Sequence, residues 1–349
     1  MPTMTETVNL QLSGMIQSLI SGGQFEDQFY LKETAQVKMK TALVTGVSGY
    51  LGSHLAKSLK KAGWKVVGLD KKYPKNKYID MFQFCDIIEQ EAVNNLFHRV
   101  SIDVVFHLAG RIEVCESHKN PITFYRNNVI GTINVLNAMK LFGVKNIVYS
   151  STAGVYKSKE EPIKESDEVN PMNNPYASSK YSAELAIRHS GLNHVIFRYF
   201  NLAGADPDGE FGEDHNPETH LIPRILQNLN NFQIYGENYS TPDGTCIRDY
   251  VHVSDVAEAH ILAADLLERH HGGEIINLGT GKGYSVKQII EMIGEVAKRP
   301  IGFTYAEKRP GDPSKLVANI NYAETLLHYQ PRHDIMSILE TAYKWQNKK

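Results

Sequence analysis

The sequence predicts an α/β protein built on a doubly wound parallel sheet, with a smaller C-terminal α/β region that binds the substrate. From residue 40 onward, short apolar runs alternate with helical segments, as in parallel sheets whose strands are joined by helices. A glycine-rich turn separates the first apolar run from the first helical segment. The composition, with 42% hydrophobic and 22% charged residues over 349 positions, is that of a globular chain rather than a disordered one.

Six apolar runs define the expected strands, which lie at residues 41–45, 65–69, 82–85, 103–108, 146–150 and 194–198. Helical segments fill the intervals, notably at residues 50–62, 121–142 and 175–189, and Pro or Gly marks several of their ends. Sheets of this kind bind ligands at the carboxyl ends of their strands. We therefore expect the functional residues at those ends.

Charge and cysteine usage exclude several classes of protein. Lys and Arg number 37 and Asp and Glu number 39, so a formal net charge of −2 gives no reason to expect a nucleic acid or an anionic membrane as partner. No apolar run approaches the roughly 18 residues that a membrane span needs. The scattered Cys85, Cys115 and Cys246 fit neither a disulfide framework nor a metal site. We therefore expect no metal and a cytoplasmic location.

The turn that follows the first strand is the first chemical signal. Gly46 permits the tight turn, Gly49 lets the backbone approach a pyrophosphate, and Gly52 lets helix and strand pack closely. The N-terminus of the next helix adds free N–H groups and a partial positive charge. The residues expected to bind a dinucleotide here are Gly46, Ser48, Gly49, Tyr50, Leu51 and Gly52.

Asp70 follows the second strand, where a carboxylate can bind both ribose hydroxyls of an adenosine. It would repel a 2′-phosphate, so NAD is favoured over NADP, although Lys71 and Lys72 soften that preference. The alternative is a solvated loop acid.

Two more strand ends carry candidate cofactor contacts. Asp86 and Ile87 follow the third strand and could bind the adenine edge, although a turn-forming aspartate is a competing interpretation. His107 reads as a packed residue at the end of the fourth strand. The small residues after it suit a close backbone approach to a cofactor; these contacts are Leu108, Ala109 and Gly110.

The second chemical signal is Tyr176 followed by Lys180 on a predicted helix. Side chains four apart share a helix face, with Cβ atoms roughly 6 Å apart. A nearby ammonium would lower the pKa of the phenol and make it a general acid or base. Thr152 ends the fifth strand and could relay the proton of the reacting substrate oxygen. The alternatives are a surface Tyr–Lys pair and a plain strand-terminal threonine.

These residues carry a family resemblance. The glycine turn, the run Ser150-Ser151-Thr152 and the Tyr176/Lys180 pair resemble the extended short-chain dehydrogenase/reductase superfamily. Within that superfamily, further segments of this chain resemble the UDP-galactose 4-epimerase family. They are Arg198-Tyr199-Phe200-Asn201, Gly212-Glu213-Asp214, residues 243–253 and Asn277-Leu278-Gly279. The resemblance covers residue 40 to the C-terminus. It implies tightly bound NAD, a nucleotide-sugar substrate and a homodimer joined through helices 121–142 and 175–189.

The resemblance also implies individual binding residues. Asn127, Ser150 and Tyr199 are further expected contacts to NAD. The implied contacts to the nucleotide sugar are Asn201, Arg248 and Arg309 at the diphosphate, Asp312 at the uridine ribose, Tyr235 at the uracil ring, and His220 and Leu221 along the pocket.

The family mechanism suits these parts. Tyr176 would remove the C4 hydroxyl proton through Thr152 while NAD takes the hydride. The 4-keto sugar would then turn to present its other face to the nicotinamide. Return of the hydride to that face would invert the configuration at C4.

One position bears on the size of the sugar. In the family, the residue four positions after the Asp that binds the uridine ribose, Asp312 in this chain, flanks the sugar's C2 substituent. A large aromatic side chain at that position crowds an N-acetyl group. This chain has Leu316 at that position. We therefore expect the N-acetylated UDP-hexoses to be interconverted alongside UDP-glucose and UDP-galactose, unless Leu316 serves only in packing.

Two departures from the family and several rival functions stay open. The family commonly has Asn shortly after the acid that binds the adenosine ribose, where this chain has Lys71-Lys72-Tyr73. It also has Lys beside the nicotinamide, where this chain has Ile112, so contacts from Arg111 and Ile112 are undecided. Rival functions are UDP-pentose or uronate 4-epimerisation, 4,6-dehydration and non-catalytic nucleotide sensing. Ala153-Gly154 lack the acid and base that a dehydratase has after the threonine, which disfavours dehydration.

Three regions are expected along the chain. Residues 1–38 form an extension with one short amphipathic helix, interpreted as a non-catalytic appendage in preference to a docking helix. Residues 39–202 form an NAD-binding Rossmann domain. Residues 203–349 form mainly the nucleotide-sugar-binding region, with segments that return to the Rossmann domain.

Overall fold

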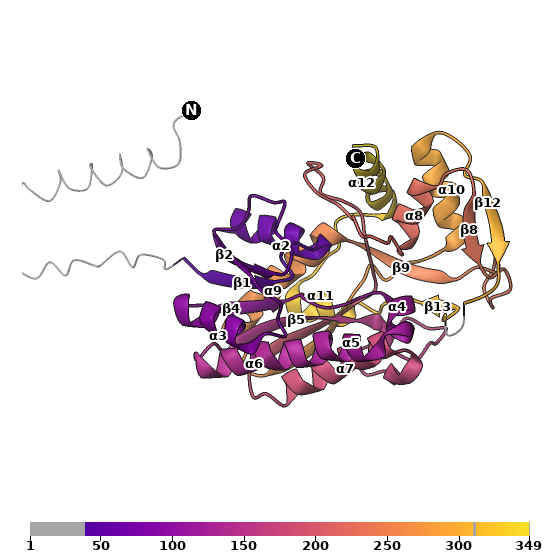
Figure 1. The fold of residues 1–349 in the computed structure, drawn as a ribbon. Helices are drawn as coiled ribbons and strands as arrows, with labels where there is room; N and C mark the ends of the chain where they lie inside the picture. Colours follow the sequence, from indigo (N-terminus) through magenta and orange to yellow (C-terminus); the bar gives the residue numbers. More distant parts are fainter. Residues whose placement is uncertain (1–38, 310–311, 349) are drawn as a thin grey trace, which may run out of the picture. The chain divides into compact units, whose positions relative to one another are not determined.

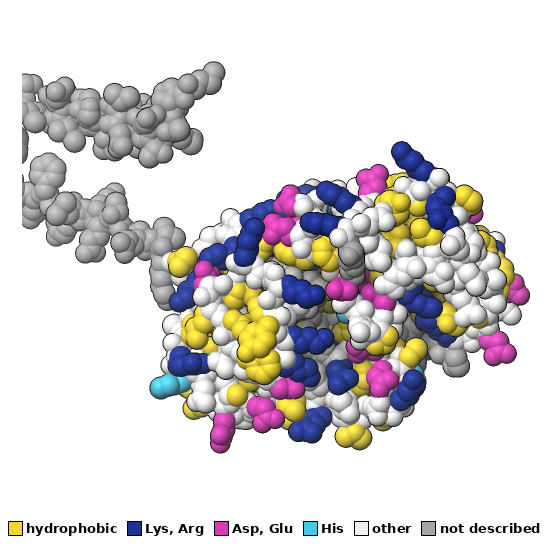
Figure 2. Space-filling view, turned by 45° about the horizontal axis from the view of Figure 1, so that its top comes forward, with side chains coloured by type: hydrophobic (Ala, Val, Ile, Leu, Met, Phe, Trp, Pro, Cys, Tyr) yellow, Lys and Arg dark blue, Asp and Glu magenta, His cyan; other side chains and the backbone are white. Residues whose placement is uncertain are grey.

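The computed structural model describes residues 39–309 and 312–348. The helix expected in residues 1–38 lies outside the described residues. Among the described helices, none combines the length and apolar character needed to cross a membrane. Figure 2 shows basic and acidic side chains interspersed over one face of the molecule.

A seven-stranded parallel sheet forms the centre of the fold, in the order β3–β2–β1–β4–β5–β6–β10. Its strands are β1 (Thr41–Thr45), β2 (Lys65–Asp70), β3 (Met81–Phe84), β4 (Val104–His107), β5 (Asn146–Thr152), β6 (Asn193–Tyr199) and β10 (Gly273–Leu278). The chain runs outward from β1 to β3 and then returns to the other side of β1 with β4. This reversal between β1 and β4 is the switch point at which such sheets bind ligands, and it confirms the predicted doubly wound sheet.

The strands are apolar because both faces of the sheet are covered. In β1, Ala42 and Val44 face one core while Leu43 faces the other, and all three are fully buried. The first face packs against α2 (Tyr50–Lys61), α9 (Val253–Arg269) and α11 (Asn321–Leu327). The second packs against α3 (Gln90–Arg99), α6 (Gly131–Leu141) and α7 (Pro175–Arg188), which run together along one side of the sheet in Figure 1.

The helix expected at residues 121–142 is interrupted. The structure has α5 (Pro121–Tyr125), a π-helical turn at Arg126–Ile130 and then α6. A π-turn inserts an extra residue into a helix and often marks a functional site. Here it places Asn127 and Asn128 in the interior, where both are buried.

The remaining elements build a smaller lobe beside the sheet (Figure 1). β9 (Ile247–His252) pairs with β7 (Asn201–Ala203), β11 (Gly283–Ser285) and β13 (Lys315–Leu316), and β8 (Phe232–Tyr235) pairs with β12 (Phe303–Ala306). A third apolar core joins β7, β8, β9 and β11 to α8 (Leu221–Gln227), α10 (Val286–Ala297) and α12 (Ile335–Gln346). The short α4 (Val114–Lys119) follows β4.

Candidate active site

The glycine turn closes tightly against the end of β4. Gly46 has a φ of 74°, and its N–H donates to the Leu69 carbonyl at 2.8 Å. A Cβ at Gly46 would lie 2.8 Å from the backbone nitrogen of Ala109, and one at Gly52 would collide with the Gly46 carbonyl oxygen. Any side chain here would separate β1 from β4 or from α2, so the turn needs glycine at both positions.

Asp70 at the end of β2 is tied to the same turn. One carboxylate oxygen accepts from the Ser48 N–H at 3.0 Å, and the other accepts from the Lys72 N–H at 2.9 Å. Asp70 is therefore an ordered acid beside the glycine turn, as a ribose ligand must be. Lys71 is 3.2 Å from Asp86, so its charge has a partner other than a 2′-phosphate.

Asp86 and Ile87 follow β3. One Asp86 oxygen accepts from the Ile88 N–H at 3.3 Å, so Asp86 does form the turn that was the competing interpretation. Ile87 is buried, and its carbonyl accepts from the Asn134 side chain at 3.0 Å. The structure thus gives both residues a structural role, which leaves the proposed adenine contact to their remaining groups.

Asn128 fixes the loop after β4, and the sequence analysis did not identify it. Its side-chain oxygen accepts from the Arg111 N–H at 2.7 Å, and its amide group donates to the Arg111 carbonyl and to Ser179 Oγ at 3.1 and 2.9 Å. Asn128 therefore fastens the loop that contains Gly110 to helix α7. The signal that could have found it is the pair of adjacent amides at 127–128 in the helix at 121–142.

Tyr176 begins α7 beside the end of β5. Asn174 caps the helix by accepting from the Ala177 N–H at 2.8 Å, which sets the direction of its first turn. Burial raises the pKa of Tyr176 to about 12, although the neighbouring Thr152 hydroxyl acts to lower it. The structure thus joins the two residues expected to form the proton relay.

Lys180 lies one turn further along α7 and is 4% exposed. Its ammonium nitrogen lies 4.4 Å from the centre of the Tyr149 ring, and a Cβ at Gly110 would come within 3.6 Å of it. Burial lowers the pKa of Lys180 to about 7, although Glu184 acts in the opposite direction. Lys180 was expected to lower the pKa of Tyr176, with an oxidised nicotinamide as a second positive charge. In this structure burial dominates at the phenol and raises its pKa, and the Lys180 ammonium lies over the Tyr149 ring.

Two buried hydroxyl groups beside this pair fit a ligand. Ser150 Oγ and the Tyr199 hydroxyl lie toward the ends of β5 and β6. Neither atom forms a hydrogen bond with another described residue. Burial raises the pKa of Tyr199, while neighbouring Ser150 lowers it. Buried polar atoms normally have partners. These two, the close-packed glycine turn and the ordered Asp70 carboxylate together fit a dinucleotide at the carboxyl ends of the strands.

Three of the residues expected to bind the sugar nucleotide meet in the small sheet around β9. Asn201 begins β7 opposite Tyr250, and Leu316 in β13 is opposite Arg248. The Arg248 guanidinium donates to the Ile247 carbonyl at 2.9 Å and lies 3.8 Å from Asp312. The structure therefore brings Arg248, Asp312 and Leu316 together.

Tyr235 and Arg309 form a second pair of predicted residues. The Arg309 guanidinium lies 3.9 Å from the centre of the Tyr235 ring, within the range of a cation–π contact. Arg224 lies over the same ring at 5.7 Å, and both arginines lower the pKa of Tyr235. A base that stacks on the face now covered by Arg309 would have to displace its guanidinium.

His220 and Leu221 lie at the start of α8. His220 is the residue before the helix, and its ring Nδ1 is hydrogen-bonded to the Glu213 carboxylate. The Leu221 side chain packs against the third core. One ring nitrogen of His220 is thus already engaged by the protein.

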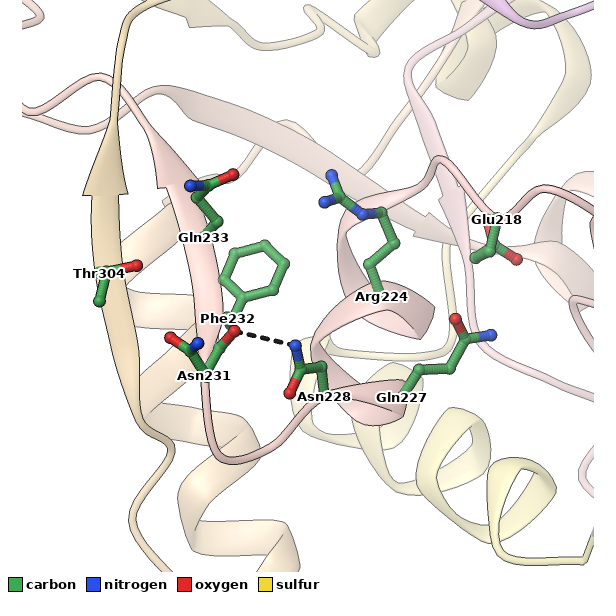
Figure 3. A pocket seen from close by; sticks show the side chains of 8 residues that line it. All are labelled: Glu218, Arg224, Gln227, Asn228, Asn231, Phe232, Gln233 and Thr304. Atoms are coloured by element: carbon green, nitrogen blue, oxygen red, sulfur yellow. Dashed lines mark hydrogen bonds between the residues drawn. The ribbon is translucent and has the colours of Figure 1, made fainter.

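A polar cavity of about 390 Å³ lies near this region, between α8 and the β8–β12 pair (Figure 3). Arg224 of α8 and the Phe232 ring face each other across it, 5.6 Å apart. Asn228 donates to the Asn231 carbonyl at its base, at 2.9 Å. None of the residues expected to bind cofactor or substrate lines it, so it is separate from the predicted site.

Two undecided positions are clarified by their contacts. The Arg111 guanidinium lies 5.9 Å from the centre of the Phe124 ring, and Ile112 is partly exposed. His107 is fully buried with both ring nitrogens bonded, to Thr45 at 2.8 Å and to Thr132 at 2.9 Å. His107 is a packed residue, as expected.

The fold and this arrangement define a nicotinamide dinucleotide-dependent α/β enzyme with a Tyr–Lys pair. Residues 42–279 match the model of the NAD dependent epimerase/dehydratase family, and the chain belongs to that family. It is 42% identical to the UDP-glucose 4-epimerase of Halalkalibacterium halodurans over 88% of this chain and 95% of that protein.

Solved structures give the same result. UDP-glucose 4-epimerase from Bifidobacterium longum in complex with NAD⁺ and UDP is 32% identical, with a TM-score of 0.82 over 88% of this chain and 98% of that one. The UDP-Glc/GlcNAc 4-epimerase from Campylobacter jejuni is 31% identical, with a TM-score of 0.76 over 89% of this chain and all of that one.

Proposed function

We propose that the protein interconverts the C4 epimers of a UDP-hexose, such as UDP-glucose and UDP-galactose, through a transient 4-keto sugar and on tightly bound NAD. The observation that carries the proposal is the closeness of the Tyr176 phenol to the Thr152 hydroxyl at the carboxyl end of β5. Family membership and the relatives named above support the same reaction.

The cofactor-binding residues would act together along the carboxyl ends of the strands. Asp70 would bind the adenosine ribose and exclude a 2′-phosphate, and the start of α2 would hold the pyrophosphate through its free N–H groups. When bound, NAD supplies the acceptor and then the donor of the hydride at C4, with a positive charge that favours a phenolate. The other proposed contacts are Asp86, Ile87, Leu108, Ala109, Gly110, Asn127, Ser150 and Tyr199.

Proton transfer would fall to Tyr176 and Thr152. Tyr176 takes the proton of the C4 hydroxyl through Thr152 as C4 is oxidised, and it returns the proton when the keto group is reduced. Lys180 supplies a positive charge on the same helix face and can hold a ribose hydroxyl. A pKa of about 7 lets Lys180 carry that charge for part of the time at neutral pH.

The smaller lobe would hold the substrate by its nucleotide. Asn201, Arg248 and Arg309 would bind the diphosphate, Asp312 the uridine ribose and Tyr235 the uracil, with His220 and Leu221 along the pocket. Anchoring at the diphosphate leaves the hexose free to turn, which inversion at C4 requires. Residues 203–349 would then be mainly a nucleotide-sugar-binding region, built against the Rossmann domain of residues 39–202.

The rival functions have less support. Ala153 and Gly154 follow Thr152 in a short 3₁₀ turn, where a dehydratase needs an acid and a base. A sensing protein would need neither the Tyr176 phenol nor the buried Lys180 ammonium. A UDP-pentose or UDP-uronate would use the same proton relay, and product analysis separates these substrates.

We further propose that the chain forms a homodimer in the cytoplasm. The first of the two helices expected at the interface, residues 121–142, exposes Ile122, Ile130 and Leu141, which are 77%, 48% and 66% exposed. Exposed hydrophobic side chains along this segment suit association with a second copy. Light scattering of the purified protein would return twice the chain mass.

The test is to incubate purified protein with UDP-galactose and no added cofactor, and to separate the products by chromatography. UDP-glucose should form, and acid denaturation of the protein should release NAD(H), because an internal redox cycle gains nothing from exchange. A protein that releases no nicotinamide and is inactive without added NAD would contradict the proposal.

A further inference from the structure

A buried ion pair lies near the proposed proton relay. Two nitrogens of the Arg198 guanidinium donate to the two Glu184 oxygens, at 2.6 and 3.1 Å, in a bidentate pair. The Arg198 side chain is 3% exposed and that of Glu184 is fully buried. Glu184 lies in α7 and Arg198 in β6, and neither is among the residues expected to contact cofactor or substrate. The proton relay described above leaves this pair without a role.

The Glu184 carboxylate ties α7 to the strand ends of the candidate site. Its Oε1 atom also accepts a hydrogen bond from the Ser151 hydroxyl. Ser151 is opposite Arg198 in the register of β5 and β6. The next pair in that register is Thr152 and Tyr199. One carboxylate therefore fastens the helix of the relay tyrosine to both strands, at the positions directly before Thr152 and Tyr199.

The same carboxylate lies one helical turn from Lys180. The two residues are four apart on the buried face of α7, so their Cβ atoms are roughly 6 Å apart. A unit charge at such a distance acts strongly through the protein interior, where the effective dielectric constant is low. Burial lowers the pKa of Lys180 to about 7, and Glu184 acts against burial to raise it. Without Glu184, the ammonium form of Lys180 would be less stable still.

The aromatic side chains around Lys180 are neutral at pH 7. The ammonium lies over the ring of Tyr149, and burial raises the pKa of that phenol. Burial raises the pKa of Tyr176 to about 12 as well. Burial also lowers the pKa of His107, at the end of β4, to about 3. Within the described part of the chain, Glu184 is therefore the acid that acts on Lys180.

The position of the Glu184–Arg198 pair matters more than its strength. A buried ion pair is weak evidence for stability, because apolar side chains of similar volume often stabilise a fold as well. We propose that Glu184 is a positioning residue of the proton relay, which fastens α7 to the ends of β5 and β6 and supplies the negative charge that the Lys180 ammonium needs in the interior. It would act through Lys180 and the two strands without touching cofactor or substrate. The inference rests on the proposed function, to which the relay belongs.

Glu184→Gln tests the charge. The amide keeps the shape of the side chain and can still accept from Ser151, but it is neutral. We expect Lys180 to titrate about one pH unit lower, or more, in this variant. At pH 7 that change alone reduces the charged fraction of Lys180, and with it kcat, about fivefold. KM for UDP-galactose should stay within about threefold of wild type, because the proposed nucleotide contacts lie in the smaller lobe.

Two measurements follow the effect. Carbon-13 NMR of labelled lysine side chains gives the titration of Lys180, whose signal is assigned by its loss in Lys180→Arg. Initial rates at a series of pH values give the pH profile of kcat, whose alkaline arm should move with that titration. The NMR titration needs no turnover. If it shifts in Glu184→Gln while the wild-type protein forms no UDP-glucose, the proposed function is overturned and the electrostatic part of this inference is supported.

Two more variants separate this role from that of a plain ion pair. Glu184→Gln leaves the Arg198 charge unpaired, so a double variant with Arg198→Gln removes both charges and covers the case in which the single variant fails to fold. In the double variant, Lys180 should still titrate below wild type, because Glu184 is the charge that acts on it. Asp206→Asn is the control. It breaks an equally buried pair with Lys57 of α2, on the opposite face of the sheet, and should lower only the melting temperature.

The result that would overturn the proposal is equally specific. It is a Lys180 titration and a pH profile of kcat that match wild type in both Glu184 variants. A change of the same size in Asp206→Asn would overturn it too, because loss of any buried ion pair would then explain the effect.

Discussion

The ammonium nitrogen of Lys180, in α7, lies 4.4 Å from the centre of the Tyr149 ring in β5. Tyr149 is 1% exposed, and its ring also stacks on the ring of His107, with centroids 5.5 Å apart. Lys180 is therefore held by an aromatic face, with no carboxylate bound to its nitrogen in the contacts described. This explains why burial lowers its pKa to about 7.

The first prediction concerns Tyr176. Tyr176→Phe should lower kcat about 10²- to 10⁴-fold, because it removes the group that moves the C4 proton. Binding of UDP should change little. Tyr181→Phe, on the same helix, is the control, and initial rates of UDP-galactose conversion measure both. A Tyr176→Phe enzyme within threefold of wild type would refute the assigned role.

Asn128 provides a prediction about positioning. Asn128→Ala leaves the partly buried Arg111 N–H without its partner and should lower the free energy of unfolding by about 1–3 kcal/mol. It should also lower kcat, because Gly110 and α7 are no longer fastened together. Asn137→Ala, at an exposed position of α6, should do neither. Urea denaturation and initial rates are the measurements, and equal behaviour of the two variants would contradict this account.

Stability should fall as the solution becomes acidic. Burial lowers the pKa of His54 and His260 to about 4 and of His107 and His252 to about 3, against about 6.5 in the unfolded chain. Below pH 6.5 these histidines therefore become protonated in the unfolded chain while they stay neutral in the folded protein. Each group reduces the free energy of unfolding by up to about 1.4 kcal/mol per pH unit, down to its folded pKa.

Urea denaturation at pH 6.5 and 4.5 measures this loss. Asp249, whose pKa burial raises to about 6, offsets one part of it, because its folded form takes up a proton earlier than the unfolded chain. His260→Gln should show a shallower pH dependence, and His189→Gln, at an exposed position, should match wild type. A free energy of unfolding that stays constant between the two pH values would count against the buried neutral histidines.

Leu316 offers a prediction about the sugar. Leu316→Tyr should lower kcat/KM for the N-acetylated UDP-hexoses ten- to a hundredfold relative to the plain ones, because overpacking a dense site costs about 1–3 kcal/mol. Leu316→Met, with nearly the same volume, is the control. If the Tyr variant keeps the wild-type ratio, another part of the pocket sets the size of the sugar.

Much of the fold could be predicted because each strand is buried on both faces. The predicted first strand agrees with β1, and the other five predicted strands overlap the observed ones, with ends shifted by one or two residues. β10 was missed because its start, Gly273 and Glu274, is partly polar and it lies in a stretch of mixed composition. The π-turn in the helix at 121–142 could not be predicted, since it depends on buried contacts of Asn128 with distant residues.

The candidate site was predictable where local geometry decides it. The Tyr176–Thr152 contact and the turn around Gly46 follow from strand ends and helix spacing. The direction of Lys180 and the contacts of Asn128 with Arg111 and Ser179 depend on side chains that only the tertiary fold brings together. Patterns in the sequence carry no signal of such contacts.

The most direct test of the central claim follows one atom. UDP-galactose labelled with deuterium at C4 is converted by the enzyme in ordinary water, and the product is analysed by NMR. Since the hydride removed from C4 should return to the same carbon, we predict that UDP-glucose carries deuterium at C4. UDP-glucose with ordinary hydrogen at C4 would contradict the account.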